Sequence, residues 1–565
     1  MPKNDLHGVA FPKLDEAQMA SLGHCPLTTL KRFRDGEKLF EAGDRDFRFF
    51  VVKSGEIEIL DEADETPKRL AVLRPGEFTG DEVQLTGGPA IVSAVARLGT
   101  EAYEVSPDGL RQILNYHPDL GDVIIQAFIA RRQLLRQWGE FTSLRVIGSR
   151  DSRDTFRVRD FLAKNRVPFI WLDPEADPQA KELLKRYHAS DDAIPVVDWG
   201  RKLLLRNPTN RQLAEALGLR RPLRQAAYDL VVVGAGPAGL AASVYGASEG
   251  LSTLTLEHSG PGGQAGRSMR IENYLGFPTG ITGAELAERA VVQVSKFGAT
   301  LPVGTQVTGL TFDKASSVIH LDSGETVAAK CLLIATGADY RKLGVEGCER
   351  LEGCGVYYAA TPLEAQMCGG SEVLVVGGGN SAGQAAVFLA EQVRKVYLVI
   401  RGDDLHKNMS EYLVRRIEEN PKIEVLRNTE VRRMSGDTHL GEVELVNNKT
   451  GEVRTIRTPA LFSFIGAAPR TEWLPPEIEK DDKGFVRTGQ ALSQSDRWTA
   501  RRPPFLLETS RPGVFAAGDV RSGSVKRVAS AVGEGAMAVQ FVHEYMKELP
   551  NGAPADVPVS QGQKG

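Results

Sequence analysis

Two glycine-rich segments combine the residue types that hold a phosphate group. The first reads Gly234-Ala235-Gly236-Pro237-Ala238-Gly239, and the second reads Gly377-Gly378-Gly379-Asn380-Ser381-Ala382. Each follows an apolar run typical of a buried strand and precedes an alanine-rich run typical of a helix. In that context the glycines permit a tight turn and let the backbone approach a pyrophosphate, which the amides at the helix start then bind. The sequence therefore predicts two dinucleotide sites.

The residue that ends the next strand differs between the two turns. After the first turn, the strand over 251–256 ends in Glu257, which is placed to accept a hydrogen bond from a ribose hydroxyl. After the second, the strand over 396–400 ends in Arg401, with Lys407 nearby as another cation. Because an arginine can pair with a 2′-phosphate, the second site is expected to prefer NADPH over NADH. The alternative is that Arg401 only caps its strand.

The five cysteines are Cys25, Cys331, Cys348, Cys354 and Cys368, and no two of them have the spacing Cys-x-x-Cys. Such an odd, scattered set is typical of a reducing compartment rather than of a disulfide framework. We interpret these residues as buried small apolar side chains or idle thiols.

Length and charge limit the class of protein. A chain of 565 residues is too long for one core and should divide into roughly three or four domains. A net charge of −4 provides no basic field for nucleic acid, and no apolar run has the length needed to span a bilayer. The N-terminus lacks the layout of a signal peptide, so a cytoplasmic location is expected. A small molecule or a protein remains open as the partner.

Short β-like runs near the N-terminus, over 49–52, 57–60 and 70–73, alternate with glycine turns and predict a small β-barrel or jelly roll. The stretch resembles the cyclic-nucleotide-binding domain family, whose phosphate cassette is a Gly-Glu pair followed by Pro-Arg. Here the matching positions read Gly80-Asp81 and Pro89-Ala90. Ala90 cannot neutralise a phosphate, so we expect the barrel to serve as a docking or regulatory module that has lost its cyclic nucleotide.

An apolar-periodic helix is predicted over about 120–140, as a dimer seam or as part of the barrel's core. From 144 to 219 the pattern becomes β-α-β-α-β-β-α and resembles a glutaredoxin or thioredoxin-type domain, with Ile194-Pro195 at that family's cis-proline. The family's redox pair falls on Ser152 and Thr155, which cannot form a disulfide. The domain is then either a spacer or a recognition surface.

From about 226 to 548 the chain resembles the thioredoxin reductase family of pyridine-nucleotide flavoproteins. The resemblance rests on several motifs that occur in the family's order, and it implies FAD at the first turn and NADPH at the second. Asp519 is the implied acceptor for a ribityl hydroxyl. The motifs that would surround the flavin are Gly262-Gly263-Gln264, Ile271-Glu272-Asn273-Tyr274, Ala335-Thr336-Gly337, Gly518-Asp519 and Lys526-Arg527-Val528-Ala529.

One segment departs from this family at its redox centre. Reductases of the family carry Cys-Ala-Thr-Cys just before the second turn, whereas this chain reads Ala359-Ala360-Thr361-Pro362. Disulfide exchange begins with attack by a thiolate, so this segment cannot relay electrons. Cys354 and Cys368 flank the gap and are not expected to replace the missing pair.

The expected fold is therefore multidomain, with a β-barrel or jelly roll, an α/β thioredoxin-like domain and two Rossmann-type α/β domains that bind FAD and NAD(P)H. Our boundaries are 1–141 for the barrel with its helix, 142–222 for the thioredoxin-like domain, 223–340 and 469–549 for the two parts of the FAD domain, 341–468 for the NAD(P)H domain, and 550–565 for a disordered tail.

These features favour an FAD-dependent NAD(P)H oxidoreductase that passes electrons from the flavin directly to an acceptor, such as a ferredoxin-like protein, a quinone or oxygen. Two alternatives stay open. One is a flavin-containing sensor that binds a partner through its N-terminal modules, and the other is a disulfide reductase that works by a different route. By analogy with both families a homodimer is expected.

Overall fold

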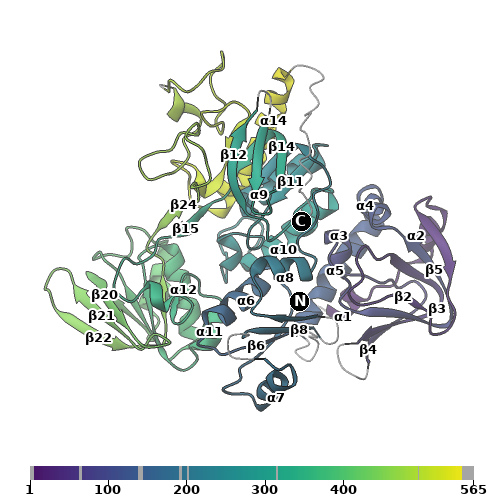
Figure 1. The fold of residues 1–565 in the computed structure, drawn as a ribbon, viewed down its shortest axis with the longest axis horizontal. Coiled ribbons are helices and arrows are strands. Elements are labelled where there is room, and N and C mark those ends of the chain that lie inside the picture. The colour runs from purple at the N-terminus through teal and green to yellow at the C-terminus, as the bar shows by residue number, and fades with distance from the viewer. Residues whose placement is uncertain are drawn as a thin grey trace. The chain divides into compact units, whose positions relative to one another are not determined.

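The computed structural model describes residues 6–62, 67–137, 144–189, 194–199, 203–313, 316–493 and 495–549 (Figure 1). The tail predicted over 550–565 lies outside the described residues. Two compact units make up the chain. Unit 1 comprises Met1–Ile147, Arg166–Leu223 and Arg289–Gly304, and unit 2 comprises Gly148–Asn165, Arg224–Glu288 and Thr305–Gly565.

Unit 1 begins with an antiparallel sheet in the order β1-β5-β3-β4, with β2 paired to β5. Its strands are β1 (Thr28–Arg32), β2 (Lys38–Phe40), β3 (Phe49–Asp61), β4 (Lys68–Leu73) and β5 (Ser93–Val105). The helices that accompany it are α1 (Leu6–Ala10), α2 (Glu16–His24), α3 (Val83–Thr86), α4 (Pro107–Tyr116) and α5 (Pro118–Gln137). The expected N-terminal β-module is therefore present.

The two strands predicted over 49–52 and 57–60 are one continuous strand, β3, so the expected turn at Ser54-Gly55 is wrong. The strand passes Gly55 through irregular pairing with β5 instead of reversing. Gly55 has a φ of +81°, and a Cβ there would lie 2.7 Å from the Thr100 Cα. The Thr100 hydroxyl accepts a hydrogen bond from the Glu56 amide and donates one to the Glu56 carbonyl, so the polar groups of the bulge remain paired.

Helix α5 contributes side chains to the core of the N-terminal module. Leu120, Ile124 and Phe128 are buried together with residues of β3 and α4, and Ala130 and Leu134 pack against α1. Its apolar periodicity is thus explained by core packing, one of the two interpretations that the sequence allowed.

The rest of unit 1 contains a four-stranded mixed sheet in the order β7-β6-β8-β9. Its strands are β6 (Leu144–Ile147), β7 (Ile170–Leu172), β8 (Val196–Trp199) and β9 (Leu203–Arg206), with helices α7 (Pro178–Arg186) and α8 (Asn210–Ala216). Together with helix α6 (Arg153–Lys164), these elements follow the order β-α-β-α-β-β-α predicted for 144–219. The Ile194–Pro195 peptide bond is cis.

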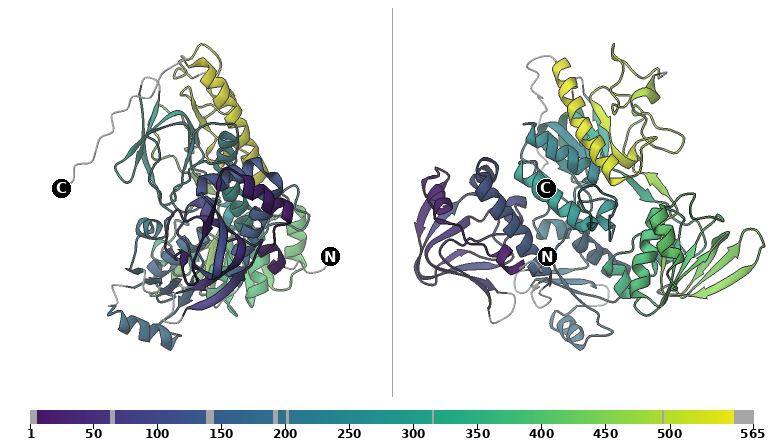
Figure 2. Two further views of the ribbon diagram at one scale, coloured as in Figure 1. Left: turned by 90° about the vertical axis from the view of Figure 1, so that its right-hand side faces the viewer. Right: turned by 180° about the vertical axis from the view of Figure 1, so that it is seen from behind.

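Unit 2 has two larger sheets (Figure 2). The first has the order β11-β10-β14-β13-β12, with β25 beside β14, and β10, β11, β14 and β25 run parallel to one another. Its elements are β10 (Ala227–Val233), α9 (Pro237–Ser248), β11 (Thr253–Leu256), β12 (Val307–Phe312), β13 (Ser317–Leu321), β14 (Thr326–Ile334), β25 (Val514–Ala516) and α14 (Val528–Glu548). Helix α10 (Gly283–Lys296) begins in this unit and ends in unit 1.

The second sheet is fully parallel, in the order β16-β23-β17-β18-β19. Its elements are β16 (Val356–Tyr357), α11 (Pro362–Met367), β17 (Glu372–Val376), α12 (Asn380–Gln392), β18 (Lys395–Val399), α13 (Glu411–Glu418), β19 (Ile423–Leu426) and β23 (Leu461–Ser463). A three-stranded antiparallel sheet follows, formed by β20 (Thr429–Ser435), β21 (Glu442–Asn447) and β22 (Val453–Arg457).

A narrow ribbon connects the two larger sheets of unit 2. Its strands, β15 (Ala338–Tyr340) and β24 (Ala467–Pro469), pair antiparallel, with Ala338 opposite Pro469. Helix α6 (Arg153–Lys164) also belongs to unit 2, although it follows β6 in the chain. Over the residues that the structure describes, no helix is long and apolar enough to cross a membrane.

Candidate functional site

The first glycine turn links β10 to α9, as the sequence predicted. Gly234 has a φ of +104°, and a Cβ at this position would lie 2.4 Å from the Ala335 carbonyl oxygen. A Cβ at Gly239 would lie 1.9 Å from the Gly234 oxygen. These two glycines are therefore required by the packing of the turn against β14 and of α9 against the turn.

Gly236 differs from its neighbours because its open side faces free space. A Cβ there would have no neighbour closer than the Gly263 Cα at 4.0 Å. Gly236 is the N-cap of α9, and Pro237, which has no amide hydrogen, is its first residue. The amides free to bind an anion at this helix start are therefore those of Ala238 and Gly239, at the positive end of the helix dipole. The turn has the shape and polarity to hold a pyrophosphate, so its residues fit FAD.

Glu257 lies directly after β11 and closes the same turn. One of its carboxylate oxygens accepts the Ala235 amide at 2.8 Å, and the other accepts the amides of Ser259 and Gly260 at 2.8 and 3.0 Å. The side chain is 8% exposed. Glu257 therefore fixes the backbone on both sides of the turn, a role that sequence reasoning missed, in addition to the ribose contact predicted for it.

The sheet around β10 and the elements that pack on it form the flavin-binding half of unit 2 (224–288, 305–340 and 469–549), and the C-terminal part of this half meets the first turn at Gly518, which precedes Asp519. A Cβ at Gly518 would lie 3.2 Å from the Ala238 Cβ, and one at Gly535 of α14 would lie 2.1 Å from the Ala238 oxygen. The close packing of α14 on α9 therefore brings Asp519 to the phosphate turn. Burial raises the pKa of Asp519. The nearby Glu534 carboxylate raises this pKa further, whereas the Lys526 ammonium lowers it.

The remaining predicted flavin contacts lie in loops of this half. Gly262 donates to the Ala235 oxygen at 2.8 Å, Gly263 faces Gly236, and the Gln264 amide donates to the Ala338 oxygen. Thr336 donates its hydroxyl to the Arg470 oxygen at 2.8 Å, next to Gly337. Asn273 is exposed in the loop after Ile271, and Arg527 is the N-cap of α14, which begins with Val528 and Ala529.

The second glycine turn has the same arrangement as the first, with one tightly packed glycine and one that faces open space. A Cβ at Gly377 would lie 2.6 Å from the Phe464 oxygen, whereas at Gly379 the nearest atom would be 3.9 Å away. Gly379 is the N-cap of α12, and Asn380 accepts the Ser410 amide at 2.7 Å. Burial raises the pKa of Tyr340, to which Ser381 is hydrogen-bonded. The open space at Gly379 fits a second pyrophosphate.

The two cations predicted for a 2′-phosphate are exposed after β18. Arg401 directly follows Ile400, and its carbonyl accepts the Asn448 side-chain amide at 3.0 Å. Lys407 pairs with Asp403 at 2.8 Å, a hydrogen bond that raises the pKa of Lys407. Arg401 thus remains the more direct partner for a phosphate, since Lys407 already has a carboxylate.

The segment 359–362 forms the start of α11. Thr361 is the N-cap, its backbone amide donates to the Glu364 carboxylate at 2.8 Å, and Pro362 is the first helical residue. Glu364 is 3% exposed, and burial raises the pKa of its carboxyl group. This buried acid was not identified from the sequence, although Thr361-x-x-Glu364 is the pattern of a capping box.

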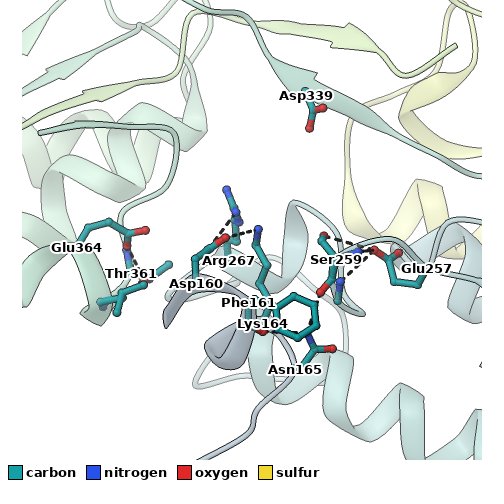
Figure 3. A network of polar contacts seen from close by, with 12 residues as sticks. Asp160, Phe161, Lys164, Asn165, Glu257, Ser259, Arg267, Asp339, Thr361 and Glu364 are labelled. Carbon is teal, nitrogen blue, oxygen red and sulfur yellow. Dashed lines mark hydrogen bonds and ion pairs between the residues drawn. The ribbon is translucent and has the colours of Figure 1, made fainter. Parts of the chain in front are cut away.

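Helix α6 contributes a cluster of charges beside the flavin half (Figure 3). Asp160 pairs with Lys164 at 2.6 Å and with Arg267 at 3.3 Å, while Asn165 donates to the Ser259 oxygen at 2.8 Å. At the other end of the helix, Ser152 accepts the Thr155 amide at 3.2 Å as the N-cap. The residues at the supposed redox positions therefore stabilise a helix start.

All four cysteines of unit 2 are buried free thiols. Burial raises the pKa of Cys331, Cys348 and Cys354, and it raises that of Cys368 to about 12. The Cys354 thiol donates to the Asp151 oxygen, whereas Cys368 donates to the Glu364 oxygen. The thiols of Cys354 and Cys368 thus have separate partners, and burial disfavours the thiolate form of all four cysteines.

A cavity of about 80 Å³ lies in the N-terminal module, lined by apolar side chains such as Phe40, Leu73 and Ala90. Ala90 is 1% exposed and brings no charge to it. The buried Arg131 donates to the carbonyls of Ala10, Phe78 and Gly80, and burial lowers its pKa to about 10. The guanidinium of Arg131, which lines this cavity, thus already donates its hydrogen bonds to backbone carbonyls of the protein.

The comparisons with known proteins agree with this geometry. Residues 228–535 match the family described as pyridine nucleotide-disulphide oxidoreductase, which is more than half of the chain. The chain belongs to this family. Residues 30–117 match the cyclic nucleotide-binding domain. Members of the thioredoxin reductase group use FAD and NADPH, and this chain is an FAD-dependent NAD(P)H oxidoreductase.

Individual relatives cover the same part of the chain. Thioredoxin reductase of Treponema pallidum (strain Nichols) is 36% identical over 57% of this chain and 99% of its own length. That of Bacillus subtilis (strain 168) is 35% identical over 57% and 96%. Among solved structures, Lactococcus lactis thioredoxin reductase in its FR conformation has a TM-score of 0.52 at 31% identity, covering 57% of this chain and 100% of that one.

Proposed function

We propose that this protein is an FAD-dependent NADPH oxidoreductase that delivers electrons directly to an external acceptor, without a redox disulfide of its own. The observation that carries the proposal is the start of α11, where Ala359 and Pro362 stand at the positions of the family's cysteines. The acceptor classes that suit this chemistry are a ferredoxin-like protein, a quinone or oxygen.

The thiols of unit 2 support the same proposal. Exchange with a disulfide needs an accessible thiolate. Cys354 and Cys368, which flank the redox segment, are 5% and 1% exposed, and burial raises the pKa of both. A substrate disulfide would meet neither an exposed sulfur nor a charged one at these positions.

The bound cofactors would supply the hydride and electron chemistry, and the residues of the chain bind and orient them. The helix starts at Gly236 and Gly379 face open space that can admit phosphates, and Glu257 holds the first turn in shape. Arg401 would pair with the 2′-phosphate that distinguishes NADPH from NADH. Asp519 is the residue proposed to accept a hydroxyl of the ribityl chain.

The test replaces all five cysteines with serine in the full-length holoprotein. Anaerobic stopped-flow mixing with NADPH measures bleaching of the flavin, and steady-state turnover is measured with ferricyanide, menadione and oxygen. We expect the variant to keep both activities within about twofold of the parent protein, since no thiol takes part. Turnover that depends on the cysteines would overturn the proposal.

The same experiment separates an enzyme from a sensor. A protein that uses flavin only as a reporter has no need to be reduced quickly by NADPH. Bleaching of the flavin slower than about 0.01 s⁻¹, far below ordinary enzyme turnover, would favour the sensor. Ser152, which caps α6 instead of forming a redox pair, is compatible with such a sensor.

A further inference from the structure

Helix α6 contacts the flavin-binding half of unit 2 through its C-terminal end. The Asp160 carboxylate pairs with Arg267, and Asn165 donates its side-chain amide to the Ser259 oxygen. The fit is close, because a Cβ on Gly260 would lie 2.8 Å from the Lys164 Cβ. These contacts fall on the loop that follows Glu257, next to the first glycine turn (Figure 3).

The N-terminal end of the same helix contacts the nicotinamide-binding half of unit 2, which comprises 341–468. Arg153 donates to the carbonyl oxygens of Glu349 and Glu352, the latter at 2.7 Å. The Phe156 ring lies 5.3 Å from that of Tyr357, measured between centroids. Tyr357 belongs to β16, which leads into the segment 359–362, so the contact is made beside the altered redox segment.

Over the residues that the structure describes, the two halves are also joined by a ribbon and by an ion pair. The chain passes between them through the ribbon of β15 and β24, which contains three paired positions. An ion pair between Glu272 and Arg416 joins them at another point. A two-stranded ribbon of this length can bend, as hinges between domains do.

We propose that α6 is an intramolecular clamp, which holds the flavin-binding and nicotinamide-binding halves in one relative orientation by binding both. The surface formed by the Glu349 and Glu352 carbonyls and the Tyr357 ring is then a docking site for a segment of this same chain. The inference goes beyond the proposed function, because it concerns the movement of the halves and not the identity of the acceptor.

The exposure of the Cys354 thiol should report whether α6 has left its docking site. The Cys354 thiol donates to the Asp151 oxygen, just before α6, at 3.3 Å, and Gly353 lies under Phe156. Cys354 is 5% exposed with α6 in place. If the N-terminal end of α6 leaves its docking site, this thiol loses part of its cover and becomes open to alkylation.

The experiment measures alkylation of each cysteine by iodoacetamide, using mass spectrometry on the folded holoprotein. In Arg153→Ala, which removes both carbonyl contacts, we expect Cys354 to react at least about tenfold faster, the change that corresponds to losing roughly one charged hydrogen bond. Arg394→Ala is the matched control. Arg394 is likewise an arginine with a contact in the nicotinamide-binding half, and its partner there is Glu372 of β17, at 3.1 Å.

Cys331 in the core strand β14 reports on general unfolding, because it is fully buried away from α6. Faster alkylation of Cys354 with Cys331 unchanged supports the clamp. An equal rise at both cysteines, or no rise at Cys354, overturns it. If Arg153→Ala fails to fold, Arg153→Lys keeps the charge but loses the two-pronged geometry, and the same selective rise at Cys354 is expected. None of these outcomes depends on turnover, so a failure of the clamp is distinguishable from a failure of the proposed function.

Discussion

Arg416 of α13 and Glu272 form a two-pronged ion pair, with the Arg416 Nη1 2.6 Å and its Nη2 3.2 Å from the two carboxylate oxygens. Glu272 directly precedes Asn273, a predicted flavin contact, whereas α13 belongs to the nicotinamide-binding half. The guanidinium holds the pKa of Glu272 below its usual range. The flavin-binding and nicotinamide-binding halves are thus joined by an ion pair in the loop that contains Asn273.

Replacement of Glu272 by glutamine should lower the free energy of unfolding at pH 7 by about 0.5 kcal/mol, because a partly exposed pair contributes little. A depressed pKa means that the contribution is complete above the pKa of an unfolded glutamate and is lost as pH falls through the lower folded value. The difference between parent and variant should therefore shrink as the pH falls below the pKa of an unfolded glutamate, about 4.3, and vanish only below the lower folded pKa. Urea unfolding at several pH values measures it, and a difference that persists in acid would contradict the assignment.

The glycines of the first turn should separate binding from folding. In Gly236→Leu the added side chain enters open space, so the apoprotein should keep its thermal stability while the ratio of FAD to protein falls at least about tenfold. In Gly239→Ala the new Cβ would meet the Gly234 oxygen, and the fold itself should lose about 2 kcal/mol or more. Flavin absorbance and thermal unfolding distinguish the two. Loss of stability in Gly236→Leu would place that side chain in packed protein instead.

Arg401→Ala tests the predicted preference for NADPH. Removal of one charged contact to a phosphate should raise KM for NADPH about tenfold or more and leave KM for NADH nearly unchanged. Lys407→Ala should have a smaller effect, since Lys407 is already paired with Asp403. Steady-state kinetics with both nucleotides provide the readout. Equal losses for NADH and NADPH would show that Arg401 only caps β18.

The N-terminal module should not bind cyclic AMP. Its cavity of about 80 Å³ is smaller than an ordinary ligand pocket of roughly 300 Å³ or more, and Ala90 offers no charge for a phosphate. Isothermal titration calorimetry with about 1 mM cyclic AMP should therefore show no binding. A dissociation constant of about 1 mM corresponds to a binding free energy of only about 4 kcal/mol. The double change Asp81→Glu and Ala90→Arg restores the family's cassette and is the variant in which any residual affinity should appear. Micromolar binding by the parent protein would contradict this prediction.

Local sequence patterns predicted much of this structure. Both glycine turns lie between a strand and a helix because the apolar run, the glycines and the alanine-rich run are contiguous and specify the unit by themselves. The elements over 144–219 were also predicted closely, since each has its own turn signals and hydrophobic period. The Ser54-Gly55 turn was wrong because a glycine that admits a bulge and a glycine that ends a strand look alike without the partner strand that carries Thr100.

Long-range contacts could not be predicted in this way. Nothing near Arg153 or Asp160 indicates that α6 binds carbonyls of residues 349 and 352 and a guanidinium at 267. The backbone contacts of Glu257 also depend on a loop whose path follows from packing, and the burial of Glu364 depends on the elements around α11. Such contacts join residues far apart in the chain and leave no periodic trace in the sequence.

The pairing of Ala338 with Pro469 means that the chain leaves the flavin-binding sheet and returns to it at adjacent points. A stretch with neighbouring ends can be excised and its ends rejoined by a short turn without disturbing the strands on either side. We therefore expect that the nicotinamide-binding half can be deleted and its ends joined, which leaves a flavin-binding polypeptide that would have to take electrons from a source other than a pyridine nucleotide.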